Sequence, residues 1–126
     1  MQPRFDKRLL VVDDCETTRR LIALVFASSE VLIVGEGVNG RDAIELVEQM
    51  RPDVVLMDYH MPVMDGITAA RLLKQQPHPP AIVLFTSDDS VDLPGDAATA
   101  GVDVLLAKGC SHDVLRQTVV GAARAA

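Results

Sequence analysis

Short apolar runs and longer amphipathic segments alternate along this chain from beginning to end. The five apolar runs cover residues 9–12, 31–35, 54–57, 81–85 and 102–107. Runs this short, bounded by charged residues, glycine or proline, are typical of strands that are buried on both faces. We therefore expect five strands that form the interior of the protein.

The segments that follow these runs have apolar residues at helical spacing. They predict helices over 15–27, 40–50, 67–76, 88–100 and 112–123. Asn39 is placed to cap the second helix, and Ser111 or His112 begins the last one. Pro94 and Gly95 fall in the middle of the fourth segment, so we expect that helix to be short, broken or irregular.

Strands and helices that alternate with short connections require a parallel sheet with right-handed crossovers. The pattern therefore predicts an α/β fold with a doubly wound, five-stranded parallel sheet. A chain of 126 residues is the size of one domain, and we assign residues 1–126 to a single domain. Aromatic residues make up 3% of the chain and tryptophan is absent, so we expect an aliphatic core.

Charge and cysteine content exclude several classes of protein. The formal net charge of −6 argues against direct nucleic-acid binding by this domain. Cys15 and Cys110 form no metal-binding motif, and we interpret both as buried or half-buried free thiols. No segment is apolar enough to span a membrane, and the first ten residues carry charges where a signal peptide has an apolar run. We therefore expect a cytoplasmic protein without a membrane partner.

Polar side chains follow the apolar runs at the ends of four predicted strands. They are Asp13 and Asp14 after the first run, Asp58 after the third, Thr86 after the fourth and Lys108 after the fifth. In open parallel sheets, ligands bind in the crevice outside these carboxyl ends. Asp14 alone could be a helix cap and Asp58 alone a turn residue. Separate structural roles do not explain why acids, a hydroxyl and an amine all occupy one rim, which favours a functional site.

The residue types on this rim indicate a particular chemistry. Three carboxylates that meet in one crevice require a cation, and an all-oxygen ligand set selects a hard ion such as Mg²⁺. A lysine ammonium and a threonine hydroxyl are donors for a doubly charged group with several oxygens. Together they predict a phosphoryl-transfer site. Asp58 is the candidate nucleophile, because Asp13 and Asp14 can share the metal.

Short motifs around these residues form a more specific pattern. It consists of Val11-Val12-Asp13-Asp14, Met57-Asp58, Met61-Pro62, Met64-Asp65-Gly66, Thr86 and Ala107-Lys108 in this order and spacing. In this pattern, the chain resembles the receiver domain of two-component response regulators over nearly its whole length. The resemblance implies a flavodoxin-like sheet in the strand order 2-1-3-4-5.

The resemblance also implies a function for the rim. Asp58 would accept a phosphoryl group from the phosphohistidine of a sensor histidine kinase or a phosphotransfer protein. By position, the implied site residues are the metal ligands Asp13, Asp14, Asp58 and the backbone carbonyl of His60, and the phosphoryl contacts Thr86 and Lys108. A receiver catalyses only its own phosphoryl transfer and dephosphorylation, so we do not expect an enzyme that acts on other substrates.

One short segment resembles a particular subfamily. Lys108-Gly109 followed by Ser111 is similar to NarL-type receivers, which usually precede a DNA-binding helix-turn-helix and act in transcription regulation. We identify no such output domain within the 126 residues, so a truncated regulator and a stand-alone receiver both stay open. A receiver homodimer is a further open interaction.

Three positions depart from the receiver pattern. Leu105 stands where receivers usually have a tyrosine or phenylalanine that moves inward when the threonine engages phosphate. Gly109 stands where many have a cis-proline, and Pro94-Gly95 disrupts a helix of the usual signalling face. These departures predict that a phosphorylation signal leaves the domain differently or weakly. The alternative function is a degenerate receiver that acts as a phosphorylation-independent protein interaction module.

His60 and Asp88 lie two residues after Asp58 and Thr86, where receivers set how quickly the phosphoryl group is lost to water. We hypothesise that His60 influences this lifetime by orienting water or shielding the acyl phosphate. The alternative is a solvated loop histidine without a role. His60 also stands where a phosphatase with an aspartyl nucleophile would need a second acid, which disfavours that enzyme class. Tyr59, the only tyrosine, should report binding at the site by its fluorescence.

Overall fold

Five parallel strands form a single sheet in the computed structural model, which describes residues 7–126. The strands are β1 Lys7–Val12, β2 Val31–Gly37, β3 Val54–Met57, β4 Ala81–Thr86 and β5 Val104–Ala107. Their order in the sheet is β2-β1-β3-β4-β5, and every neighbouring pair is parallel. The predicted fold class and strand order are both confirmed. Part of the charged first segment used for the expected location lies outside the described residues.

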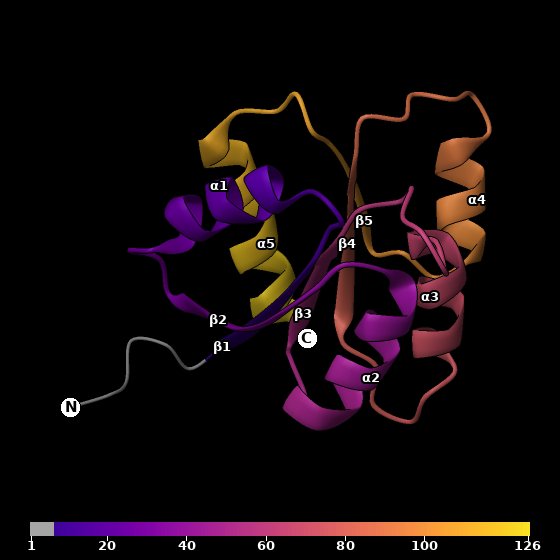
Figure 1. Cartoon of the computed structure of the whole chain (residues 1–126), viewed down its shortest axis with the longest axis horizontal. Helices are drawn as coiled ribbons and strands as arrows, with labels where there is room; N and C mark the ends of the chain where they lie inside the picture. The colour runs from indigo at the N-terminus through magenta and orange to yellow at the C-terminus, as the bar shows by residue number, and fades with distance from the viewer. Residues whose placement is uncertain (1–6) are drawn as a thin grey trace.

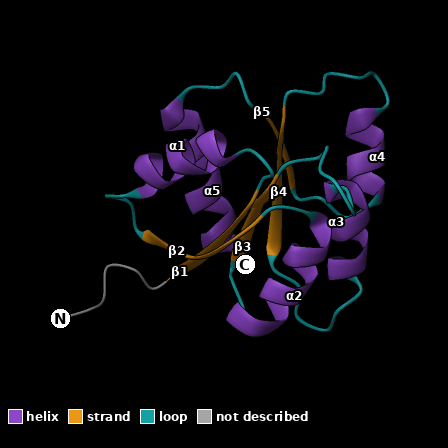
Figure 2. Ribbon diagram, viewed as in Figure 1, coloured by secondary structure: helices purple, strands orange, loops and turns teal. Residues whose placement is uncertain are grey.

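A helix follows each strand, and the helices form two layers around the sheet (Figure 1). They are α1 Glu16–Phe26, α2 Gly40–Met50, α3 Gly66–Lys74, α4 Leu93–Thr99 and α5 His112–Ala125. Helices α1 and α5 pack on one face of the sheet, and α2, α3 and α4 pack on the other (Figure 2). None of the helices in residues 7–126 is long and apolar enough to cross a membrane.

Alternation of side chains along each strand builds the two layers of the core. In β1, Leu10 and Val12 belong to the apolar cluster under α2, α3 and α4. Leu9 and Val11 belong to the cluster under α1 and α5. All four residues are essentially inaccessible to solvent. The strands are therefore continuously apolar because both of their faces are covered.

Side-chain caps begin two of the helices where the sequence predicts them. The side chain of Asn39 accepts a hydrogen bond from the N–H of Asp42 at the start of α2. Ser111 caps α5 in the same way, so this helix begins at His112. The interpretation of Asp14 as a helix cap is wrong, because α1 begins after Cys15 and has no side-chain cap. Asp14 thus has no part in starting the helix.

Several element boundaries differ from the sequence prediction, among them those of β2 and α4. Strand β2 does not end at Gly35, because Glu36 and Gly37 continue its pairing with β1. Helix α4 is short, as predicted, but Pro94 does not break it. Pro94 lies in the first turn of α4, where a helix makes no use of the proline's missing N–H. The Pro-Gly pair therefore shortens this helix from its beginning.

Candidate functional site

Backbone pairing continues past the strand ends and brings the predicted rim residues to one edge. The N–H of Asp13 donates to the carbonyl of Gly37, and the N–H of Asp58 donates to the carbonyl of Val12, each at 3.0 Å. At the ends of β4 and β5, the N–H of Lys108 donates to the carbonyl of Thr86 at 3.0 Å. The positions of these functional side chains are thus set by the register of the sheet.

Three carboxylates gather at this edge. Asp13, Asp14 and Asp58 each offer an oxygen, and these oxygens lie within 4.8 Å of one another. Asp13 is 1% exposed and Asp58 is 8% exposed, whereas Asp14 is open to solvent. This acidic cluster therefore combines two buried carboxylates with one that reaches water.

Lys108 joins the two buried acids of the cluster. Its Nζ lies 3.0 Å from Oδ2 of Asp13 and 3.1 Å from Oδ2 of Asp58. Burial alone would lower the pKa of Lys108, but its interactions with both carboxylates outweigh burial and raise it. For Asp58, burial has the opposite effect and raises the pKa, because it disfavours the charged carboxylate. The nearby ammonium of Lys108 offsets only part of this increase. The site thus holds a firmly charged lysine beside an unusually basic carboxylate.

One buried oxygen, Oδ2 of Asp13, indicates that the acidic cluster can bind a divalent cation. Oδ2 of Asp13 is buried and, within residues 7–126, contacts the Lys108 ammonium at 3.0 Å but no other hydrogen-bond donor, so it has room for a further partner. Buried carboxylate oxygens normally have such partners. A hard cation held by Asp13, Asp14 and Asp58 would supply one, since Mg²⁺ is bound through carboxylates and water. The backbone carbonyl of His60 stays a prediction as a further ligand.

Thr86 occupies the end of β4 and is 3% exposed. Its hydroxyl oxygen accepts a hydrogen bond from the N–H of Asp88 at 3.2 Å. Within the described part of the chain, Thr86 makes no hydrogen bond with Asp58, whose Oδ1 accepts from the N–H of Tyr59 at 2.7 Å. The structure therefore brings Lys108 into contact with the acids and places Thr86 on the same edge without such a contact.

An interaction that the sequence analysis missed joins the loops after β3 and β4. Nε2 of His60 lies 2.6 Å from Oδ2 of Asp88, and the imidazole stacks on Tyr59 with 4.0 Å between ring centroids. The His60 side chain is 64% exposed, but it is not a solvated histidine without a partner. Its hydrogen bond lowers the pKa of Asp88 to about 2. The sequence could have indicated this pair, because His60 and Asp88 each lie two residues after a rim residue, Asp58 and Thr86, and β3 and β4 are neighbouring strands.

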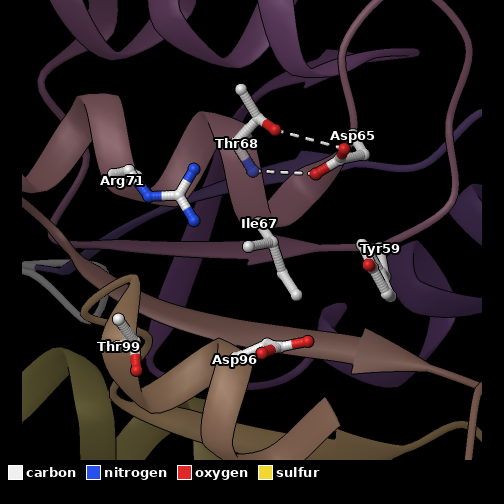
Figure 3. A pocket seen from close by; sticks show the side chains of 7 residues that line it. All are labelled: Tyr59, Asp65, Ile67, Thr68, Arg71, Asp96 and Thr99. Carbon is white, nitrogen blue, oxygen red and sulfur yellow. Dashed lines mark hydrogen bonds between the residues drawn. The ribbon is translucent and has the colours of Figure 1, made fainter. Parts of the chain in front are cut away.

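A polar pocket of about 380 Å³ lies between α3 and α4 (Figure 3). Its lining residues are Tyr59, Asp65, Ile67, Thr68, Arg71, Asp96 and Thr99. Burial, together with nearby carboxylates that include Asp65 and Asp96, raises the pKa of the Tyr59 phenol. The sequence did not indicate this pocket, and none of the acids of the cluster lines it.

The positions that depart from the receiver pattern have ordinary surroundings. Leu105 is half-buried and packs against the core under α2, α3 and α4. A Cβ at Gly109 would meet no other atom within 4 Å.

Cys110 is a half-buried free thiol, as expected, whereas Cys15 is an exposed free thiol and not a buried one. Cys15 is exposed because it stands in the loop ahead of α1 and outside the apolar face of that helix.

Comparison with known proteins places this arrangement in a family. The family model of the response regulator receiver domain matches residues 9–120. Protein-glutamate methylesterase/protein-glutamine glutaminase 1 of Pseudomonas aeruginosa is 46% identical over 81 residues, which cover 64% of this chain and 22% of that protein. A Nocardioides protein of the same description is 39% identical over 115 residues, covering 90% of this chain and 30% of that protein. The chain thus spans less than a third of these relatives.

Solved structures of receivers have the same architecture. The signal receiver domain of the response regulator NarL from Mycobacterium tuberculosis has a TM-score of 0.91 at 28% identity, covering 97% of this chain and 99% of that one. The response regulator domain of Thermotoga maritima CheB has a TM-score of 0.81 at 24% identity, with 95% of both chains covered, and shows the shared fold. With a family model that spans nearly all of its strands and helices, the chain belongs to the response regulator receiver domains.

Proposed function

We propose that this chain is a phosphoacceptor receiver of a two-component signalling system. Asp58 would take a phosphoryl group from the phosphohistidine of a sensor histidine kinase or a phosphotransfer protein. The observation that supports this most directly is the position of Lys108, whose Nζ bridges Asp13 and Asp58 at 3.0 and 3.1 Å. An ammonium group that contacts both a proposed metal ligand, Asp13, and the proposed nucleophile, Asp58, suits phosphoryl transfer.

Mg²⁺ is the cofactor that this proposal requires. Asp13, Asp14 and Asp58 would hold it, and the bound ion would neutralise charge on the phosphoryl oxygens. Asp14 is exposed and so gives the cluster a side that is open to water and to an incoming phosphodonor. The two buried acids would then fix the position of the ion relative to the nucleophile.

The residues of the chain have separate roles in the transfer. A carboxylate oxygen of Asp58 forms a bond to phosphorus as the bond from phosphorus to the histidine nitrogen breaks. The ammonium of Lys108 leaves its contact with the Asp58 oxygen to pair with the oxygens of the transferred group. The hydroxyl hydrogen of Thr86 can donate to the same group, because within residues 7–126 the hydroxyl oxygen accepts from the N–H of Asp88 and its hydrogen makes no hydrogen bond. The phosphohistidine is the only co-reactant of this step, and the product is the modified Asp58 of the domain itself.

A phosphorylation-independent interaction module is the second candidate function. The observation that favours it is the aliphatic Leu105, which packs against the core and has no ring or hydroxyl to report the state of Thr86. In this case the fold and the acidic cluster would persist while the partner surface stayed fixed. The intact set of Asp13, Asp58 and Lys108 favours the phosphoacceptor.

The relatives differ in what accompanies their receivers. The similar curated proteins are methylesterases by description, and the similar solved structures include a NarL receiver. The proposal is therefore limited to the chemistry of the receiver itself. Regulation of transcription, control of an attached enzyme and receiver dimerisation are not part of this proposal.

Mass spectrometry of the intact chain tests the proposal. After incubation with acetyl phosphate and Mg²⁺, we expect the mass of one added phosphoryl group. Asp58→Asn should abolish the gain, and so should removal of Mg²⁺ with EDTA. A wild-type chain that keeps its original mass would exclude the phosphoacceptor and leave the fixed interaction module.

A further inference from the structure

Arg19 of α1 makes two hydrogen bonds outside its own helix. Nη1 donates to the backbone carbonyl of Asp13 at 2.7 Å, and Nε donates to Oε1 of Glu36 at 3.1 Å. The side chain of Arg19 is 16% exposed, whereas that of Glu36 on β2 is 50% exposed. A guanidinium largely removed from water therefore connects the end of β1 with the neighbouring strand.

These contacts hold the peptide groups on both sides of Asp13. The N–H of Asp13 donates to the carbonyl of Gly37, the residue after Glu36, at 3.0 Å. The carbonyl of Asp13 accepts from Arg19, and Oδ1 of Asp13 accepts from the N–H of Cys15 at 2.9 Å. Both polar groups of the Asp13 backbone are thus occupied. This fixed backbone limits the orientations that the side chains of Asp13 and Asp14 can adopt.

We propose that Arg19 and Glu36 are positioning residues for the metal site at Asp13 and Asp14. The pair fixes the backbone of Asp13, so that its carboxylate and that of Asp14 are presented to one ion. This inference rests on the proposed function, because the ion is the Mg²⁺ that phosphoryl transfer requires. Contacts that orient metal ligands are typically worth about 10- to 100-fold in affinity. Since Arg19 acts through the backbone, we expect the lower end of this range.

The charge of Arg19 acts in the opposite direction to its positioning effect. A cation near a metal site repels the ion, so removal of Arg19 would tighten Mg²⁺ binding if charge were the larger effect. Glu36 neutralises the guanidinium at 3.1 Å, and this pair lies partly in water, where its remaining field is screened. Positioning is therefore the larger effect, and the sign of the change in affinity separates the two explanations.

Titration of the intact chain with Mg²⁺, followed by Tyr59 fluorescence and by calorimetry, measures this sign. We expect Arg19→Ala to raise the dissociation constant for Mg²⁺ about tenfold. Arg20→Ala is the matched control, because Arg20 is the next residue of α1 and forms an exposed ion pair with Glu16 at 3.0 Å. The control should bind Mg²⁺ as the wild type does.

Substitutions of Glu36 provide a second arm that leaves the arginine in place. Glu36→Gln keeps an oxygen that can accept from Arg19 but no longer neutralises its charge, so we expect an affinity closer to that of the wild type than the affinity of Glu36→Ala. Glu36→Ala removes the acceptor and should weaken Mg²⁺ binding. Rescue by glutamine would show that the hydrogen bond, and not the charge of residue 36, is what matters.

The dependence of phosphorylation on Mg²⁺ separates positioning from general damage to the fold. Because Arg19 is proposed to act only through the metal ligands, Arg19→Ala should reach the wild-type rate with acetyl phosphate once Mg²⁺ is saturating. Unchanged or tighter Mg²⁺ binding by Arg19→Ala would overturn the inference, and so would a low rate that persists at saturation. A wild-type chain that binds Mg²⁺ but gains no phosphoryl group would overturn the proposed function instead, leaving the affinity comparison intact.

Discussion

The rim of the sheet has two halves that are built in different ways. The acid half consists of Asp13, Asp14, Asp58 and Lys108, at the ends of β1, β3 and β5. The response half consists of Thr86, Asp88 and His60, in and after β4 and in the loop after β3. Side chains of the acid half already contact one another, with Lys108 bridging two acids. The response half is held by bonds between loop residues, and its threonine does not reach Asp58 within the described residues.

This difference separates chemistry from response. Backbone ladders place the acid half, and the rigidity of a buried parallel sheet keeps its charges close together. Hydrogen bonds between loop residues place the response half, and one of them is made by the exposed side chain of His60, so its arrangement has alternatives at little cost in free energy. A domain that is to be modified quickly and then change shape needs both properties. Each prediction below alters one half and leaves the other in place.

The largest effect is expected from removal of the cation of the acid half. Lys108→Met keeps the length of the side chain but leaves the transferred phosphoryl group without its ammonium partner. We expect the rate of phosphorylation by acetyl phosphate at saturating Mg²⁺ to fall about 10²-fold. Lys74→Met is the control, because Lys74 binds Asp103 and the carbonyl of Pro80 away from the acidic cluster. Equal rates for the two variants would contradict the assigned role of Lys108.

A smaller effect is expected from the response half. His60→Ala removes the hydrogen bond to Asp88 and the link between the loops after β3 and β4. Because those loops begin at Asp58 and Thr86, water should reach the acyl phosphate more easily, and its half-life should shorten several-fold. Loss of the phosphoryl group with time is followed by intact mass, with His112→Ala, at the exposed start of α5, as the control. A half-life equal to that of the wild type would leave His60 without this role.

The acid half was accessible to prediction because strand register follows from the apolar pattern. Once residues 9–12 and 54–57 are recognised as neighbouring strands, Asp13 and Asp58 must emerge at the same edge. Lys108 follows by the same reasoning from β5. The side-chain contacts within the cluster were not needed to identify its members.

Loop conformation set the limit of the sequence prediction. The bond from His60 to Asp88 depends on two irregular segments that carry no periodicity. Pro94 and Gly95 predict a short, broken or irregular helix; α4 is short, but which of these outcomes follows depends on the position of Pro94 within the helical turn, which the sequence pattern does not specify. The contact between Arg19 and the Asp13 carbonyl could not be predicted, because nothing in the sequence pattern distinguishes Arg19 from the neighbouring Arg20.

Buried charge in the acid half has a measurable effect on stability. Because burial raises the pKa of Asp58 above its ordinary value of 3.8, the folded protein binds a proton here more tightly than the unfolded chain does. The associated stability is complete below pH 3.8 and is lost as pH rises through the raised pKa. Asp58→Asn removes this loss, so without Mg²⁺ it should be more stable than the wild type at pH 7.

Urea denaturation at pH 7 and again below pH 3.8 measures this difference. The advantage of Asp58→Asn should disappear in acid, where both proteins are neutral at residue 58. Asp89→Asn, an exposed acid in the loop after β4, should show no such change with pH. An Asp58→Asn variant less stable than the wild type at pH 7 would mean that the contact with Lys108 outweighs burial.

The smallest effect is expected from the backbone of the loop that carries His60. Val63 has a φ of +69° and is 75% exposed, so a β-branched residue occupies the left-handed region without buried contacts that require it. Val63→Gly removes the steric cost, although the flexibility of glycine in the unfolded chain offsets part of the gain. We expect the free energy of unfolding to rise by about 0.5 kcal/mol. Val91→Gly, at a position 95% exposed without a positive φ, should instead lower it. An equal decrease in the free energy of unfolding of both variants would show that the positive φ at Val63 does not destabilise the folded loop.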